Sequence, residues 1–306
     1  MVKALTSKMK EENPILYRIS QFVGLLLGAR IFMLILLAFT LYVSTFFLFN
    51  QEESLRAFVF DYKVHGIIFC SLLSIAAGGI INQFYDLEKD RLQKPFRTKL
   101  QSFLKQKYYL YSYIALNAIS LGIAYVLSPR IFVFFLVYQF LMWFYSHKLS
   151  KILIVNNITF VSLTLYPFFG MLVYYQHFSW KLFLMAAFLF LILLIVDIIK
   201  DFLTIRPDTI FGYQTLPIFA GLQVSTGIVS FLLVINALVS CLIVYKIPSH
   251  NFLMIYFSLS AILLILSLYP VFFFKFKKMF WLMNLLRIWV FIGVIFMLLN
   301  GIFERI

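Results

Sequence analysis

Nine apolar runs, most of them long enough to cross a bilayer as helices, dominate this sequence. They cover approximately residues 25–48, 64–84, 107–128, 131–146, 152–176, 180–203, 217–245, 251–273 and 280–302. Crossing the hydrocarbon core of a bilayer takes about 20 helical residues, and backbone groups there must pair within the protein. A mean hydropathy of +0.96 and a charged fraction of 12% are typical of a polytopic membrane protein. We therefore predict an all-α integral membrane protein with nine transmembrane helices in a single bundle.

The distribution of basic residues predicts the topology. No hydrophilic stretch is long enough for a second domain, so we expect residues 1–306 to form one membrane domain. Residues 1–20 form a basic segment in which we expect no cleavable signal, and we expect this N-terminus to be cytoplasmic. With that orientation, 19 of the 26 Lys and Arg residues fall on the inner side. Six fall outside, and Arg30 lies within the first predicted span. This asymmetry follows the positive-inside rule, so the net charge of +14 indicates topology and not a nucleic-acid partner.

Carboxylates are concentrated at the ends of two predicted spans, in NQFYDLEKD (82–90) and VDIIKDFLTIRPD (196–208). Both segments contain aspartates at i, i+4. This spacing places side chains on one helix face, and like charges there destabilise a helix. The pattern therefore indicates a compensating cation, and Mg²⁺ characteristically joins one or two protein carboxylates to substrate phosphates. We expect two acidic faces that hold a Mg²⁺-bridged diphosphate, with Asp208 beyond the end of its helix.

These motifs resemble those of the UbiA superfamily of intramembrane prenyltransferases, which carry N-x-x-x-D-x-x-x-D after the second helix and D-x-x-x-D after the sixth. KPFR (94–97) is similar to the K-P-x-R segment of the family, and DTIFGYQTLP (208–217) to its G-D-x-x-x-G-x-x-T-L-P ending. YSHK (145–148) resembles the Tyr-Ser segment after helix four. The likeness extends from about residue 20 to 300 and is nearest to the digeranylgeranylglyceryl-phosphate and chlorophyll-synthase types. Departures occur at Gln83, Thr204 and Pro207 and in GARIF (28–32).

The resemblance implies Mg²⁺-dependent transfer of an isoprenyl chain from an allylic prenyl diphosphate to a lipophilic acceptor: an aromatic compound, a quinone precursor or a lipid alcohol. It implies a central cavity open to the cytoplasmic side and active-site loops at 85–106 and 200–216. Two Mg²⁺ ions are expected on Asn82, Asp86, Asp90, Asp197, Asp201 and Asp208. The implied catalytic residues are Asp86, Asp90, Asp197, Asp201 and Tyr145. The implied substrate-binding residues are Arg30, Lys94, Arg97, Ser146, Lys148, Lys200 and Tyr85.

Several alternatives stay open from the sequence. Lys94 and Arg97 fit a purely topological role as well as a diphosphate contact, and Arg30 fits snorkelling to the interface. The clusters also fit a cation-coupled transporter or a catalytically inactive relative. Acceptor, chain length and oligomeric state are not specified. We expect the protein in the cytoplasmic membrane of a bacterium, surrounded by membrane lipids.

Overall fold

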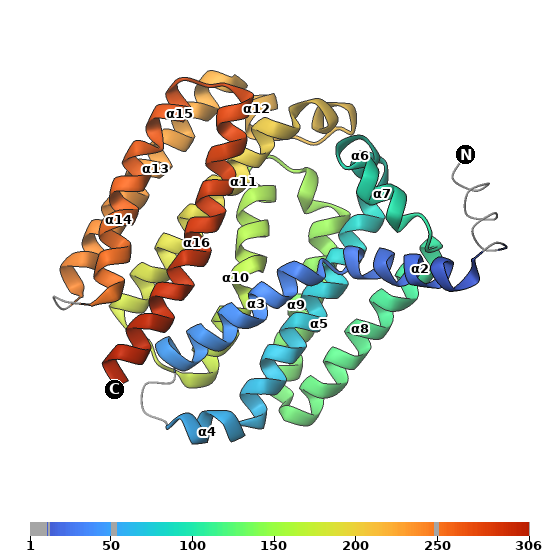
Figure 1. Cartoon of the computed structure of the whole chain (residues 1–306), viewed down its shortest axis with the longest axis horizontal. Helices are drawn as coiled ribbons and strands as arrows, with labels where there is room; N and C mark the ends of the chain where they lie inside the picture. Colours follow the sequence, from blue (N-terminus) through green and yellow to red (C-terminus); the bar gives the residue numbers. More distant parts are fainter. Residues whose placement is uncertain (1–10, 12, 50–53, 248–250, 306) are drawn as a thin grey trace. The chain divides into compact units, whose positions relative to one another are not determined.

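Helices make up all the regular secondary structure that the computed structural model describes. It describes residues 11, 13–49, 54–247 and 251–305 (Figure 1). Nine helical segments in those ranges are long and apolar enough to cross a bilayer. They are Ile31–Phe49, Tyr62–Tyr85, Gln106–Leu127, Pro129–His147, Val155–Tyr175, Trp180–Ile210, Gly221–Lys246, Phe252–Phe272 and Phe276–Phe303. The predicted all-α membrane fold and its nine spans are thereby confirmed. Most of the basic N-terminal segment, residues 1–10 and 12, lies outside the described residues.

The chain divides into two compact units. Unit 1 comprises Asp61–Leu149 and the described residues up to Phe39. Its helices are α2 (Pro14–Gly28), the start of α3 (Ile31–Ser44), α5 (Tyr62–Tyr85), α6 (Leu87–Gln93), α7 (Pro95–Gln101), α8 (Gln106–Leu127) and α9 (Pro129–His147). Ser74 Oγ lies 3.1 Å from Ser120 Oγ and accepts from Gln139 Nε2 at 3.2 Å. Each of the three comes from a different helix, so polar contacts join α5, α8 and α9 inside an apolar unit.

Helix α2 packs closely on α5 because both helices carry glycine at the contact. A Cβ added at Gly79 would lie 3.0 Å from the backbone oxygen of Gly28. Figure 1 shows α2 running across the direction of α5 and α8. Its apolar side chains Ile15, Ile19 and Phe22 are exposed. This placement brings the C-terminal end of α2 to the end of α5 that carries the first acidic motif.

Unit 2 comprises Thr40–Phe60 and Ser150–Ile306. It contains the end of α3, η1 (Thr45–Phe49), α4 (Leu55–Phe60), α10 (Val155–Tyr175), α11 (Trp180–Ile210), α12 (Leu216–Phe219), α13 (Gly221–Lys246), α14 (Phe252–Leu266), α15 (Leu268–Phe272) and α16 (Phe276–Arg305), and the short 3₁₀ helix η2 (Leu149–Lys151) begins at its boundary. Helix α11 is its central element and packs against α10, α13 and α16. Ile192, Ile195 and Ile199 on α11 are fully buried in the core. These contacts hold the helix that carries the second acidic motif.

Two predicted boundaries were wrong. The first span begins at Ile31, and Arg30 is not inside it: α2 ends at Gly28, and Arg30 occupies a turn with φ of 56°. Hydropathy misses this break because the apolar run continues through it. The predicted loops at 85–106 and 200–216 are largely helical, since α6, α7 and the end of α11 occupy them. The resemblance to the family had implied loops here, which does not exclude short amphipathic helices within them.

Candidate active site

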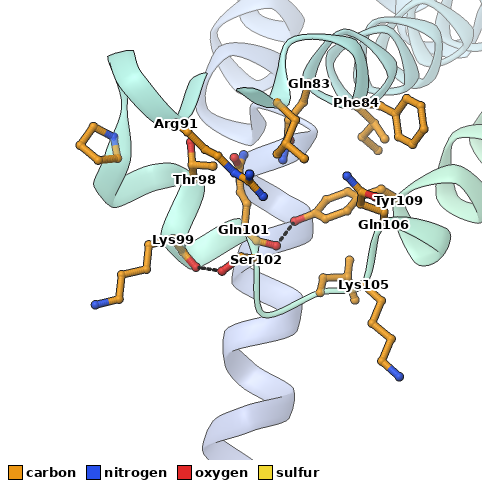
Figure 2. Close-up of a pocket in the computed structure, with 14 residues that line it drawn as sticks. Gln83, Phe84, Arg91, Thr98, Lys99, Gln101, Ser102, Lys105, Gln106 and Tyr109 are labelled. Carbon is orange, nitrogen blue, oxygen red and sulfur yellow. Dashed lines mark hydrogen bonds between the residues drawn. The ribbon is translucent and has the colours of Figure 1, made fainter. Parts of the chain in front are cut away.

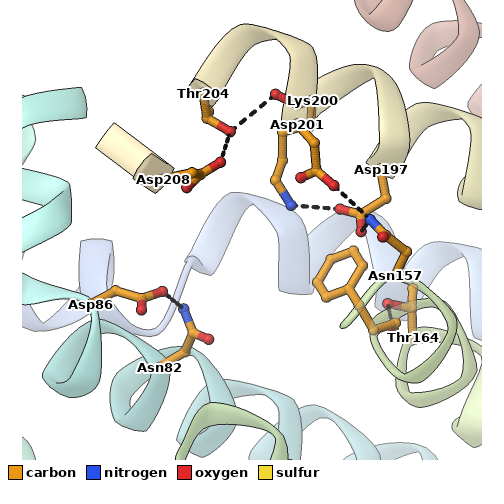
Figure 3. A network of polar contacts seen from close by, with 10 residues as sticks. Asn82, Asp86, Asn157, Thr164, Asp197, Lys200, Asp201, Thr204 and Asp208 are labelled. Carbon is orange, nitrogen blue, oxygen red and sulfur yellow. Dashed lines mark hydrogen bonds and ion pairs between the residues drawn. The ribbon is translucent and has the colours of Figure 1, made fainter. Parts of the chain in front are cut away.

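The first acidic motif lies where α5 ends and α6 begins. Asp86 is the junction residue, and the backbone bonds Asp86 N to Asn82 O (2.9 Å) and Asp90 N to Asp86 O (2.8 Å) continue the helical i to i−4 pattern across it. The three motif residues are therefore spaced one turn apart, as their sequence spacing predicts. Asn82 Nδ2 donates to Asp86 Oδ2 at 2.8 Å (Figure 3), and Lys94 Nζ lies 3.1 Å from Asp90 Oδ1.

Three of the predicted diphosphate-binding residues in unit 1 form an electropositive group. Arg97 is half-buried, and its guanidinium donates to the backbone oxygen of Leu27 at the end of α2. Burial lowers the pKa of Arg97, and the nearby positive charge of Arg30 lowers it further. Lys94 lies within electrostatic range of both arginines. Positive charges held this close together favour the binding of an anion next to Asp90.

The second acidic motif lies on one face of α11. Asp197, Asp201 and Asp208 are 2%, 1% and 1% exposed. At about 100° per residue, Asp201 and Asp208 lie within roughly 40° of Asp197 around the helix. Asp208 was predicted beyond the helix end, which is wrong: α11 continues through Pro207 to Ile210. A proline near a helix end costs one backbone bond, and here the Thr204 hydroxyl also donates to the Asp208 carboxylate across one turn (Figure 3).

A residue that the sequence reasoning missed joins two of these carboxylates. Asn157 on α10 is 2% exposed, and its Nδ2 donates to Asp197 Oδ2 and Asp201 Oδ2 at 2.9 Å each (Figure 3). Lys200 Nζ binds the other oxygen of Asp197 at 2.5 Å. Asn157 lies 40 residues before Asp197, so no local spacing marked it. The one available signal was an Asn pair (156–157) at the start of an apolar span, where an amide needs a partner.

The α10 helix begins with a strained turn that helps to place Asn157. Ile154 has φ of 64° and ψ of −44°, and Val155 N bonds Leu153 O at 2.7 Å across it. This is a γ-turn with positive φ, which is rare and costly for a β-branched residue. Strain of this kind, about 1–3 kcal/mol, is characteristic of functional sites. The γ-turn at Ile154 sets the direction in which α10 begins, and the first helical residues of α10 include Asn157.

The remaining predicted residues of unit 1 lie at the ends of α5 and α9. The Tyr85 ring is 5.5 Å from the His147 ring, edge to face. Ser146 is buried and donates to the backbone oxygen of Met142 in its own helix, whereas Lys148 is exposed at the end of α9. Tyr145 is half-buried. The structure therefore places His147 of the YSHK segment against Tyr85 of the first motif. The role of Tyr145 stays a prediction.

The donor chemistry of both motifs fits Mg²⁺. In the described part of the chain, no three His, Cys, Asp or Glu side chains converge into a closed metal shell. Carboxylate and amide oxygens are nevertheless the ligands that Mg²⁺ prefers. Three buried carboxylates on α11 lie with two nearby cations, Lys200 and Arg287 of α16. Asp197 and Asp201 thus lie buried one turn apart and share one amide donor, an arrangement that a bound cation would stabilise.

Comparison with known proteins identifies the family. The model of the UbiA prenyltransferase family matches residues 41–279. Curated digeranylgeranylglyceryl phosphate synthases are similar: that of Thermococcus gammatolerans is 28% identical over 174 residues, and that of Pyrococcus furiosus is 32% identical over 167 residues. These matches cover 56% and 53% of this chain. They span 61% and 58% of the relatives, less than two thirds of their length.

Solved structures share the fold along almost the whole chain. A structure described as digeranylgeranylglyceryl phosphate synthase in membranes has a TM-score of 0.71 at 20% identity and covers 92% of this chain and 99% of its own. A UbiA homolog from Archaeoglobus fulgidus bound to GPP and Mg²⁺ has a TM-score of 0.63 at 14% identity, covering 89% and 99%. The family model spans more than half of the sequence, and the fold agrees with it. This chain belongs to the UbiA prenyltransferase family.

Proposed function

We propose that this protein is a Mg²⁺-dependent prenyltransferase, which transfers an isoprenyl chain from an allylic diphosphate to a lipophilic acceptor. The observation that carries the proposal is the buried carboxylate face of α11, with Asp197 and Asp201 held by one amide. Such a face needs a cation, and the family to which the chain belongs transfers prenyl groups. The Mg²⁺-bound and GPP-bound A. fulgidus homolog supports the same reading.

The reaction breaks the bond between the allylic carbon and the diphosphate oxygen. The electron pair leaves with the diphosphate, the acceptor nucleophile forms the new bond to carbon, and the acceptor loses a proton. Bound Mg²⁺, of which we propose two ions, supplies Lewis-acid stabilisation of the charge that develops on the leaving group. Asn82, Asp86 and Asp90 of the first motif and Asp197, Asp201 and Asp208 of α11 would hold these ions.

The basic group of unit 1 has a separate role in this proposal. Arg97, Lys94 and Arg30 bind the diphosphate oxygens, because a guanidinium forms paired bonds to phosphate. Lys148, Ser146 and Lys200 are further contacts, and Tyr85 and Tyr145 face the allylic carbon as it becomes positive. Asp208 positions the end of α11 through Thr204.

The acceptor and the membrane orientation belong to the same proposal. The names of the curated relatives favour a phosphate-bearing lipid alcohol as the first acceptor to test. The basic-residue asymmetry supports a cytoplasmic N-terminus, and the resemblance to the family implies a cavity open to the cytoplasm. The bacterial host stays a prediction; the similar synthases of Thermococcus gammatolerans and Pyrococcus furiosus are archaeal.

The test is product formation by the purified full chain. The protein is incubated with Mg²⁺, geranylgeranyl diphosphate and either a glyceryl-phosphate lipid or an aromatic acid, and products are identified by mass spectrometry. Asp86→Ala and Asp197→Ala serve as inactive controls that still purify in folded form. A prenylated product from the wild type alone supports the proposal. Mg²⁺-dependent prenyl diphosphate binding without any product would indicate the inactive relative, and cation flux in vesicles without either would indicate the transporter.

A further inference from the structure

A cavity of about 540 Å³ lies in unit 1 on a different face of α5 and α6 from the acidic motif. Gln83, Leu87 and Arg91 line it, and each follows a motif residue by one position along the chain. One position is about 100° around a helix, so the cavity and the motif face different directions. Figure 2 shows the cavity enclosed by the end of α5, the α6–α7 pair and the start of α8. It is therefore separate from the proposed diphosphate contacts.

The polar lining of the cavity is basic. Arg91, Lys99 and Lys105 line it, and Asp and Glu are absent from its lining residues in the described chain. Arg91 pairs with Glu88 at 2.8 Å, but both side chains are more than half exposed, so this pair exchanges readily for another anion. Lys99 and Lys105 form no ion pair within the described ranges. Figure 2 shows them on opposite sides of the cavity with their ammonium groups directed outward, so they belong to its rim. The positive charge of this rim and of Arg91 favours an anion at the cavity.

A buried amide at the base of the cavity lacks a partner. Gln101 is 2% exposed, and its Nε2 has no hydrogen-bond partner among the described residues. The Tyr109 hydroxyl donates to the backbone oxygen of Gln101 at 3.1 Å and also has a hydrogen bond with the Gln83 side chain. The Oε1 atom of Gln83 has no hydrogen-bond partner among the described residues. Figure 2 shows the two amides and the Arg91 guanidinium directed toward the same space. Buried amides are almost always paired, so these groups indicate a polar ligand.

The remaining wall is apolar and lies at the ends of two spans. Ile80 and Phe84 come from the last turns of α5, Leu87 from α6, and Leu104 from the segment before α8. A ligand here meets cations at the rim, amides at the base and apolar side chains along the remaining wall. That combination matches an amphiphile at the level of the bilayer interface.

We propose that this cavity binds the phosphate head group of an anionic bilayer phospholipid, with its glycerol region against the Gln83 and Gln101 amides. Basic pockets beside membrane helices are characteristic sites for such head groups. Leu87 and Arg91 of α6 line the cavity, and Asp90 lies on the same helix, so an occupied site would restrain the helix that carries the last motif residue. The proposal does not depend on the proposed catalytic function.

The test is native mass spectrometry of the delipidated full chain after titration with phosphatidylglycerol or phosphatidylcholine. We expect the wild type to retain phosphatidylglycerol about tenfold more strongly, a free-energy difference of about 1.4 kcal/mol. The double variant Lys99→Gln/Lys105→Gln should lose most of this preference. The matched control Lys275→Gln/Lys277→Gln removes two exposed charges from unit 2 and should keep it. Gln101→Leu should weaken retention without lowering Tm, because it removes an unpaired buried amide.

Four results would overturn the proposal. Equal retention of the two lipids would indicate ordinary annular lipid. Equal loss in both double variants would indicate a general effect of net charge. Displacement of phosphatidylglycerol by inorganic diphosphate with Mg²⁺, but not by sulfate, would assign the cavity to the substrate. Displacement by a glyceryl-phosphate lipid alone would assign it to the acceptor.

Discussion

The Asn157 amide donates hydrogen bonds to both Asp197 and Asp201, which lie one turn apart on α11. Among the described residues, no other side-chain amide bridges two carboxylates in this way. A hydrogen bond to a charged group contributes about 1.5–3 kcal/mol. Replacement by leucine of similar size would remove the donor that fixes the orientation of the Asp197 and Asp201 carboxylates toward a shared cation. We therefore expect Asn157→Leu to raise the Mg²⁺ concentration for half-maximal turnover at least tenfold.

A second substitution separates metal positioning from folding. Asn157→Asp adds a third carboxylate, so Tm should fall without Mg²⁺ and recover with Mg²⁺ more than in the wild type. Mn²⁺ binding measured by electron paramagnetic resonance provides a readout independent of activity. Asn284→Leu is the control, because its amide bonds only to the backbone oxygen of Phe280 in the described structure. Unchanged metal binding in both Asn157 variants would make Asn157 purely structural.

Arg97 illustrates how one side chain serves both structure and charge. It contacts Leu27 O and shares a positive field with Arg30. Because lysine lacks the planar fork of arginine, we expect Arg97→Lys to reduce kcat/KM for the prenyl diphosphate about tenfold while expression stays normal. Steady-state kinetics measure this change. Arg206→Lys, at an exposed site in unit 2, should leave kcat/KM unchanged. An unchanged kcat/KM in Arg97→Lys as well would leave Arg97 with a purely topological role.

At the scale of elements, the turn before α10 carries strain that a glycine would remove. Ile154 adopts positive φ and is 48% exposed, so its side chain contributes little burial. We expect Ile154→Gly to keep or raise Tm, since glycine adopts this conformation without steric cost. Ile152→Gly, two residues earlier in the same loop, should lower Tm through added chain entropy alone. Thermal unfolding in detergent measures Tm for both variants and the wild type. A clear loss of Tm in Ile154→Gly would contradict strain at this turn.

For the whole molecule, activity should depend on a divalent cation. Both motifs present carboxylates that repel a diphosphate unless a cation intervenes. We expect EDTA to abolish turnover and Mg²⁺ or Mn²⁺ to restore it. Calorimetry with a non-hydrolysable prenyl thiodiphosphate should show binding only with the metal present. Full turnover in chelator would eliminate the metal-dependent mechanism.

The sequence alone determined the class of fold and the composition of the candidate site. Runs of about 20 apolar residues leave a chain in lipid little choice but helices, because backbone groups there must pair locally. The i, i+4 aspartates are equally local, since helix geometry converts their spacing into a shared face. Family membership confirms the resemblance on which the residue roles were based, and those roles stay predictions.

Only the tertiary structure decided what depends on contacts distant in sequence. Asn157 reaches Asp197 because α10 packs on α11, and Arg97 reaches Leu27 across 70 residues. The break at Arg30 and the continuation of α11 through Pro207 also escaped hydropathy, which averages over side chains and is insensitive to backbone torsion. Local spacing fixes which residues share a helix face. Packing of one helix against another fixes which donor each carboxylate meets.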